Sequence, residues 1–129
     1  GFYFDQTKKA LSKLRALDAN VVAGDSFTKT EKAVEQIGNN VNLDFENMDF
    51  GEQGATKITI CGKSNTDNNS INIKFFDKDG NSTTQLIEFT HTDSYQEKTF
   101  DLEKITGKGK ISFVFLPGCN FDFEWFKFW

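Results

Sequence analysis

The sequence has few of the residues that mark metal sites, disulfide scaffolds and nucleic-acid grooves. Its 129 residues include one proline, one methionine, one histidine and two cysteines. Fifteen basic residues stand against nineteen acidic ones, which gives a net charge of -4, and the basic residues form no cluster. A nucleic-acid groove needs positive charge to neutralise phosphates, so the composition excludes that class of partner.

The two cysteines and the apolar runs narrow the class of protein further. Cys61 and Cys119 lie too far apart for a zinc knuckle and are too few for a dense disulfide framework. Two free thiols are the simplest interpretation, and a single bridge between strand ends is the alternative.

The longest apolar run, 113–117, is far shorter than a membrane span. Because the chain begins at Gly1 without a signal segment, we expect a module cut from a longer protein.

Aromatic residues are abundant, and they concentrate in the last twelve residues, GCNFDFEWFKFW. Fifteen phenylalanines against one methionine are typical of a β-sandwich core. In an extended strand one face would carry Phe121, Phe123 and Trp125. The opposite face would carry Phe126 and Phe128. This pattern predicts a central strand of the sandwich, with a bulge near Trp125.

One segment near the N-terminus has helical periodicity. Asp5 can cap a helix over 5–17, in which Ala10, Leu11, Leu14 and Leu17 share one face. We therefore expect two parts, a helical segment or linker at 1–19 that packs on the body and a β-sandwich at 20–129.

The remaining segments alternate apolar and polar residues and are separated by Gly, Asn, Asp and Ser. The expected strands are 21–23, 32–38, 41–47, 56–61, 71–76, 85–90, 96–102 and 111–116, followed by the terminal strand. Strands of this length and spacing predict an all-β fold, an antiparallel sandwich or jelly roll, in a single domain.

No constellation of catalytic residues stands out. Asp44 and Glu46 share the solvent side of one strand, whereas glycoside hydrolysis needs two carboxyl groups that converge across a sugar. The single His91 has no nucleophile elbow nearby. The turn at 77–81 resembles a calcium loop, but Leu86 occupies the position of the required Glu, so a hairpin explains it better. We predict no catalytic residues.

The loops between strands are rich in amides and hydroxyls, at 38–40, 65–69, 92–95 and 118–120. Sugar binding uses such groups together with an exposed aromatic ring. Tyr95 is the one aromatic residue that the pattern places in a polar loop. Turn chemistry alone is the other explanation of these loops.

Four segments in order carry a resemblance to a known family: GDSF at 24–27, VEQIG at 34–38, NMDFGEQGA at 47–55 and FLPGCNFDFEWFKF at 115–128. Together they resemble a family 6-type carbohydrate-binding module, and more closely the galactose-binding-like modules appended to family 2 β-galactosidases of Gram-positive bacteria. The resemblance implies a jelly-roll fold and non-catalytic binding of a galactose-containing or other glycan at loops on one end. It further implies a monomeric part of a secreted bacterial glycoside hydrolase, located outside the cell or at its surface.

The resemblance also implies particular sugar-binding residues. Asn120 matches the family's Asn before the last strand, and Tyr95 matches one of its two stacking aromatics. The second aromatic corresponds to Asn39, which with Asn40 completes the predicted sugar-binding set and leaves a one-sided platform. Family modules commonly hold a structural calcium. Here the E-A-E run is replaced by Val22-Ala23-Gly24, so only Glu124 or Asp25 could supply a variant calcium site.

Two other functions remain open at this stage. A structural accessory module would pack on its parent enzyme through the amphipathic helix and bind no ligand. An independent hydrolase would need a deep pocket with two carboxylates.

Overall fold

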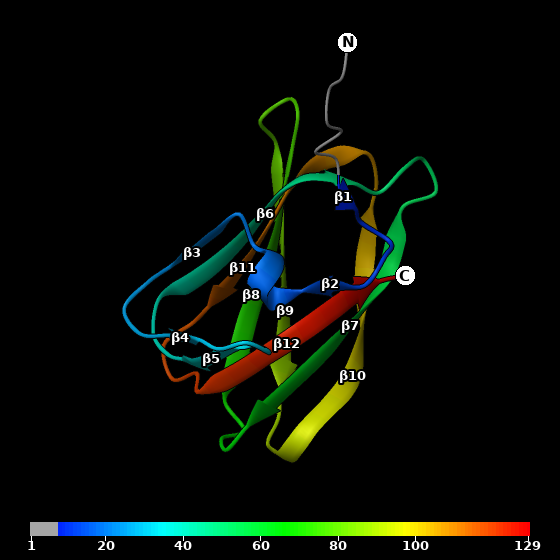
Figure 1. Ribbon diagram of the computed structural model, residues 1–129. Coiled ribbons are helices and arrows are strands. Elements are labelled where there is room, and N and C mark those ends of the chain that lie inside the picture. The colour runs from blue at the N-terminus through cyan, green and yellow to red at the C-terminus, as the bar shows by residue number, and fades with distance from the viewer. Residues whose placement is uncertain (1–7) are drawn as a thin grey trace.

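The computed structural model describes residues 8–129, which form two β-sheets packed face to face (Figure 1). The strands of the first sheet, sheet A, are β1 (Lys8–Lys9), β3 (Val21–Ala23), β6 (Val41–Asp49), β8 (Asn69–Asp77), β9 (Ser82–Phe89) and β11 (Lys108–Phe115). The strands of the second, sheet B, are β2 (Leu14–Arg15), β4 (Thr28–Lys29), β5 (Val34–Ile37), β7 (Ala55–Ser64), β10 (Thr92–Ile105) and β12 (Phe121–Phe128).

The strand order is β1-β6-β11-β8-β9 in sheet A and β10-β7-β12-β5-β4 in sheet B. In addition, β3 pairs with β6 and β2 pairs with β12. Every pair is antiparallel except β1 with β6. The predicted all-β antiparallel sandwich is confirmed.

The predicted N-terminal helix is wrong over the described part of its range, 8–17, and its residues 5–7 lie outside the described chain. Strands β1 and β2 and the start of a 3-10 turn, η1 (Ala16–Asp18), occupy this stretch. Leu14 pairs with Phe126 of β12, and Ala10 and Ala16 are fully buried while Leu11 is exposed. Pairing of this segment with the sheets, together with burial of Ala10 and Ala16, thus overrides a weak helical periodicity. The described residues contain no helix that could cross a bilayer.

Strand β12 lies between β7 and β5, which confirms the predicted central strand (Figure 1). Its register against β7 shifts between Phe123 and Trp125, which confirms the predicted bulge. The bulge reverses the alternation of side chains. Phe121 and Phe123 before it and Phe126 after it are all buried in the core. Trp125 is turned to the outer face instead, where the Lys13 ammonium lies 4.1 Å from its ring centroid.

The core between the sheets consists largely of phenylalanine. The phenylalanines with essentially no exposed surface are Phe45, Phe50, Phe89, Phe113, Phe115, Phe121, Phe123, Phe126 and Phe128. Many pack edge to face; the Phe45 and Phe126 centroids, for example, lie 4.8 Å apart at 76°. Such pairs contribute about 0.5–1.5 kcal/mol beyond their buried area.

The turn between β8 and β9 is a hairpin turn, as predicted. The Asp77 carboxylate accepts backbone N–H bonds from Asp79 and Asn81, both at 2.9 Å. Gly80 adopts a φ of 85°, which L-residues rarely take. Turn geometry therefore accounts for the Asp-Lys-Asp-Gly-Asn sequence.

Both cysteines are free and buried, which confirms the expectation of two thiols. Burial raises the pKa of Cys61 to about 11, with Glu124 and Glu97 adding to the effect, and burial also raises the pKa of Cys119. The reactive thiolate is therefore scarce in the folded protein.

We expect neither thiol to react appreciably with Ellman's reagent at about pH 8 in the native state, and both to react in guanidinium chloride. The folded state holds the Cys61 proton more tightly than the unfolded chain does. Stability is thus unaffected well below pH 9 and falls as the pH rises from 9 towards 11. Rapid stoichiometric labelling of the native protein would contradict the expected protection of both thiols.

Candidate functional site

A pocket of about 350 Å³ lies at the end of the sandwich where β7 ends and β12 begins. We call it the tip pocket. Its lining residues are Gln36, Lys63, Ser64, Asn65, Asn120 and Asp122. Ser64 and Phe121 face each other in the β7–β12 register, so loops 64–69 and 116–120 meet here. The pocket therefore lies in the predicted Asn-rich loop cluster.

A bulge in β5 shapes one wall of the tip pocket. Two residues, Glu35 and Gln36, stand opposite Asp122 in the register between β5 and β12. Gln36 has a φ of 56°, and its backbone N–H donates to Asp122 Oδ1 at 2.8 Å. A glutamine in this conformation costs about 1–3 kcal/mol, and such strain concentrates at functional sites. The bulge places Gln36 and its partner Asp122 on the wall of the pocket.

A buried asparagine fixes the floor beneath these loops. Asn69 is fully buried, and its Nδ2 donates to Ser64 Oγ at 2.7 Å and to the carbonyls of Thr66 and Phe89, each at 2.9 Å. Its Oδ1 accepts the backbone N–H of Asn120 at 3.0 Å. The two amide hydrogens are shared among three acceptors and the amide oxygen accepts one bond, so a single buried side chain holds both loops in fixed positions before any ligand arrives.

Asn120 lies where the sequence predicts it, on the wall of the tip pocket. Its Nδ2 donates to Asn65 Oδ1 at 3.0 Å, while its backbone carbonyl accepts from Ser64 Oγ at 2.6 Å. Asn120 is exposed, and its amide oxygen accepts no hydrogen bond from the described residues. A donor–acceptor pair of this kind can bond two neighbouring hydroxyl groups of a sugar.

Tyr95 belongs to strand β10, and its predicted place in a polar loop is wrong. The strand begins at Thr92, four residues earlier than expected, and has a bulge between Thr92 and Gln96. The Tyr95 hydroxyl donates to Glu35 Oε2 at 3.2 Å, although β7 and β12 lie between their strands. Three strand spacings total about 14 Å, so the Tyr95 side chain extends across the outer face of sheet B.

The surroundings of Tyr95 place it beside the tip pocket. Burial raises its pKa above the ordinary value, and the negative charges of Asp122 and Glu35 raise it further. Asp122 also lines the pocket, so the ring and Asn120 are at the same end of the molecule. The Lys32 ammonium lies 4.2 Å from the ring centroid and 3.4 Å from Glu124. A sugar stacked on that ring face must displace Lys32, which costs about 0.5–1 kcal/mol.

Asn39 and Asn40 support neighbouring loops and do not line the tip pocket. Asn39 Oδ1 accepts the backbone N–H of Gly118 at 3.0 Å, which ties its turn to the loop before Asn120. Asn40 has a φ of 54° and donates to Asp25 Oδ2 at 3.3 Å. Turn chemistry therefore explains both residues, and sugar contact by either remains a prediction.

The residues considered for calcium do not gather into a metal site. Within residues 8–129, no three His, Cys, Asp or Glu side chains converge. Glu124 is engaged with Lys32, and Asp25 accepts from Asn40. Neither residue therefore belongs to a cluster of three such side chains within the described residues.

Sequence reasoning missed four pocket residues, Gln36, Lys63, Ser64 and Asp122. All four belong to strands, where alternation indicates only whether a residue faces the core or the solvent. The one signal in the sequence is the polar pair Glu35-Gln36 between two apolar residues, which breaks strict alternation at the bulge.

The sequence matches no protein-family model and no curated protein. Its fold, however, matches solved structures. A family 6 carbohydrate-binding module from Clostridium cellulolyticum in complex with xylose is 22% identical, with a TM-score of 0.79 over 95% of this chain and 99% of that one. CsCBM6-3 from Clostridium stercorarium in complex with cellobiose is 23% identical, with a TM-score of 0.76 over 95% of each chain.

A third structure is a whole enzyme. The glycoside hydrolase family 43 arabinoxylan arabinofuranohydrolase from Bacillus subtilis, in complex with cellotetraose, matches 95% of this chain with 28% of its own. The identity is 19% and the TM-score 0.77. The fold of this chain is therefore that of family 6 carbohydrate-binding modules, and it also occurs as one part of a larger hydrolase.

Proposed function

We propose that this protein is a non-catalytic carbohydrate-binding module and that the tip pocket receives one sugar residue of a glycan. The observation that carries the proposal is the gathering of Asn65, Asn120 and Asp122 in one pocket, with Tyr95 beside it. Amide and carboxylate groups bond pairs of sugar hydroxyls, and the phenol ring packs on the C–H face of a sugar. The fold adds independent support.

The type of glycan, the parent enzyme and the location of the protein are narrower parts of the same proposal. A galactose-containing glycan follows from the resemblance to modules of family 2 β-galactosidases, and xylose- or glucose-based glycans follow from the ligands of the fold neighbours. We place the module in a larger bacterial glycoside hydrolase, as in the family 43 enzyme that shares the fold. The module would then act as a monomer, outside the cell or at its surface.

Only weak binding is expected at this site. The tip pocket is small, at about 350 Å³, and Lys32 covers one face of Tyr95. A dissociation constant on the order of 0.1–1 mM corresponds to about -4 to -5.5 kcal/mol, which a few hydrogen bonds and one stacking contact can supply.

Tyr95→Ala and Asn120→Ala are each expected to weaken retention on a polysaccharide gel about tenfold or more, because each removes one type of sugar contact. Affinity electrophoresis against galactan, xylan and β-glucan measures this effect. Tyr95→Phe keeps the ring and loses only the bond to Glu35, so it should retain binding. Asn81→Ala, in the hairpin turn after β8, is the matched asparagine control.

Failure of the folded protein to bind any galactoside, xylan or β-glucan would refute the proposal. A structural accessory module, the competing function, predicts that Tyr95→Ala and Asn120→Ala lower the melting temperature alike and leave sugar binding absent throughout. The amphipathic helix through which such a module would pack is not formed by residues 8–17.

A further inference from the structure

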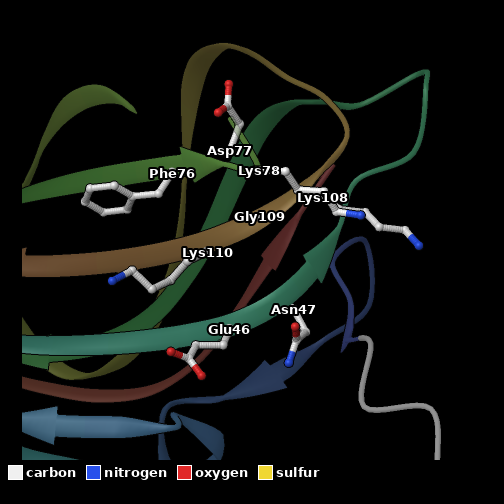
Figure 2. Close-up of a pocket in the computed structure, with 8 residues that line it drawn as sticks. All are labelled: Glu46, Asn47, Phe76, Asp77, Lys78, Lys108, Gly109 and Lys110. Carbon is white, nitrogen blue, oxygen red and sulfur yellow. The ribbon is translucent and has the colours of Figure 1, made fainter. Parts of the chain in front are cut away.

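A second and larger pocket, of about 520 Å³, lies on sheet A at the opposite end of the molecule. We call it the lysine pocket. Its lining residues are Glu46, Asn47, Phe76, Asp77, Lys78, Lys108, Gly109 and Lys110 (Figure 2). Strand β11 begins at this pocket and ends at Phe115, just before the loop that leads to Asn120. The two pockets therefore lie one strand length apart, and the lysine pocket has the volume of a small-molecule site.

A bulge builds the lysine pocket in the same way as the tip pocket. In the register between β6 and β11, Glu46 and Asn47 together stand opposite Lys110. Asn47 has a φ of 57°, the counterpart of Gln36 in sheet B. Bulges redirect side chains and are frequent beside binding sites. Each sheet thus places a two-residue polar bulge at the edge of a pocket.

The charges of the lysine pocket are unlike those of the whole protein. Three lysines face two carboxylates, in a chain whose net charge is -4. Among residues 8–129, the side chains of Lys78 and Lys108 make no ion pair or hydrogen bond. Figure 2 shows these two side chains extending in one direction and Lys110 in the other. Lys110 is held loosely, 3.9 Å from Asp44 Oδ2 and 4.7 Å from the Phe76 ring centroid.

The other groups indicate which anion fits. The negative charges of Glu46 and Asp77 disfavour a doubly charged phosphate or sulfate, and the Asp77 carboxylate can accept hydrogen bonds from hydroxyl groups. The half-buried Phe76 ring offers an apolar surface once Lys110 is displaced from the face that it covers, and the exposed Asn47 offers an amide. A ligand with one negative charge, several hydroxyls and a C–H surface satisfies all of these groups.

We propose that the lysine pocket binds a uronic acid residue of a glycan, with its carboxylate at Lys78 and Lys108 and its hydroxyls at Asn47 and Asp77. This site is separate from the tip pocket and stands whether or not that pocket binds a sugar. Two sites at opposite ends would let one module contact both a neutral and an acidic part of a glycan, or two chains.

Titration of the ¹⁵N-labelled protein with D-glucuronate and D-galacturonate tests the proposal. We expect amide shifts at Asn47, Gly109 and Lys110, with an affinity that falls as salt is raised. Glucose and galactose, which lack the carboxylate, should shift these amides about tenfold less at equal concentration. Lys78→Gln/Lys108→Gln should weaken uronate binding about tenfold, because each exposed ion pair contributes only a few-fold.

The matched control is Lys29→Gln/Lys104→Gln, which removes the same charge from strands β4 and β10 of sheet B and should leave the affinity unchanged. Equal weakening in this control, uronate shifts confined to Asn65 and Asn120, equal shifts with neutral sugars, or tighter binding of sulfate would each overturn the proposal. Loss of neutral-sugar binding at the tip pocket would leave the Gly109 shifts intact, so the two proposals fail separately.

Discussion

Asn69→Ala is expected to lower the free energy of unfolding by about 3–5 kcal/mol and to abolish glycan retention at the tip pocket. The substitution removes a side chain that makes four hydrogen bonds. It leaves the Phe89 carbonyl and the N–H of Asn120 without these partners, whereas the Thr66 carbonyl keeps its bond from Ser64 Oγ at 3.1 Å. Each unsatisfied buried group costs about 1–3 kcal/mol. Water entering the space recovers part of this cost, so the total falls short of the sum.

Urea denaturation followed by tryptophan fluorescence measures the change. Asn72→Ala is the matched control, because Asn72 lies on the same strand, is half-buried and makes no side-chain hydrogen bond within the described residues. It should change stability by no more than about 0.5 kcal/mol. A loss below about 1 kcal/mol for Asn69→Ala would show that the network is not what fixes the two loops.

Phe126→Ala is expected to cost about 3–5 kcal/mol, the range for truncating a fully buried aromatic ring. The Phe126 ring lies 4.8 Å from both Phe45 and Phe113, so it joins the two sheets. Further contacts run along β12 to Phe123 and Phe128. Sheet backbones cannot close the resulting cavity without breaking their ladders, so little of the loss is recovered.

Differential scanning calorimetry should show a melting temperature lower by roughly 10 °C or more, given the usual slope for a domain of this size. Phe100→Ala removes an equal ring from the edge strand β10, where Phe100 is only half-buried, and should cost less than half as much. Comparable losses in the two variants would contradict the view that β12 holds the core together.

Much of the fold could be predicted because alternation is a local signal. Strand β6 alternates Val41, Leu43 and Phe45 inward, and the structure buries all three. The N-terminal segment could not be predicted in the same way. Its four apolar residues fit a helix as well as two short strands, and the choice depends on pairing with Phe126 and Trp125, more than 100 residues away.

The candidate site was predictable only in part. Asn120 follows from its loop and from the family resemblance, and it does line the tip pocket. Tyr95 and Gln36 depend on bulges, which shift a side chain from one face to the other without any change in composition. Asn69 could not be predicted either, because nothing in the sequence distinguishes its buried amide from the exposed asparagine amides beside it in 65–69.

The central position of β12 has a consequence for how the protein is made. Strand β7 leaves the ribosome about 60 residues, and β5 about 85 residues, before the segment that must lie between them. Until β12 emerges, both neighbours present open hydrogen-bonding edges and an apolar face. We therefore expect sheet B to assemble only after synthesis of β12, slowly for a domain of this length, because most of its contacts join distant parts of the chain. Nascent chains arrested before Phe121 should accordingly bind chaperones and resist compaction.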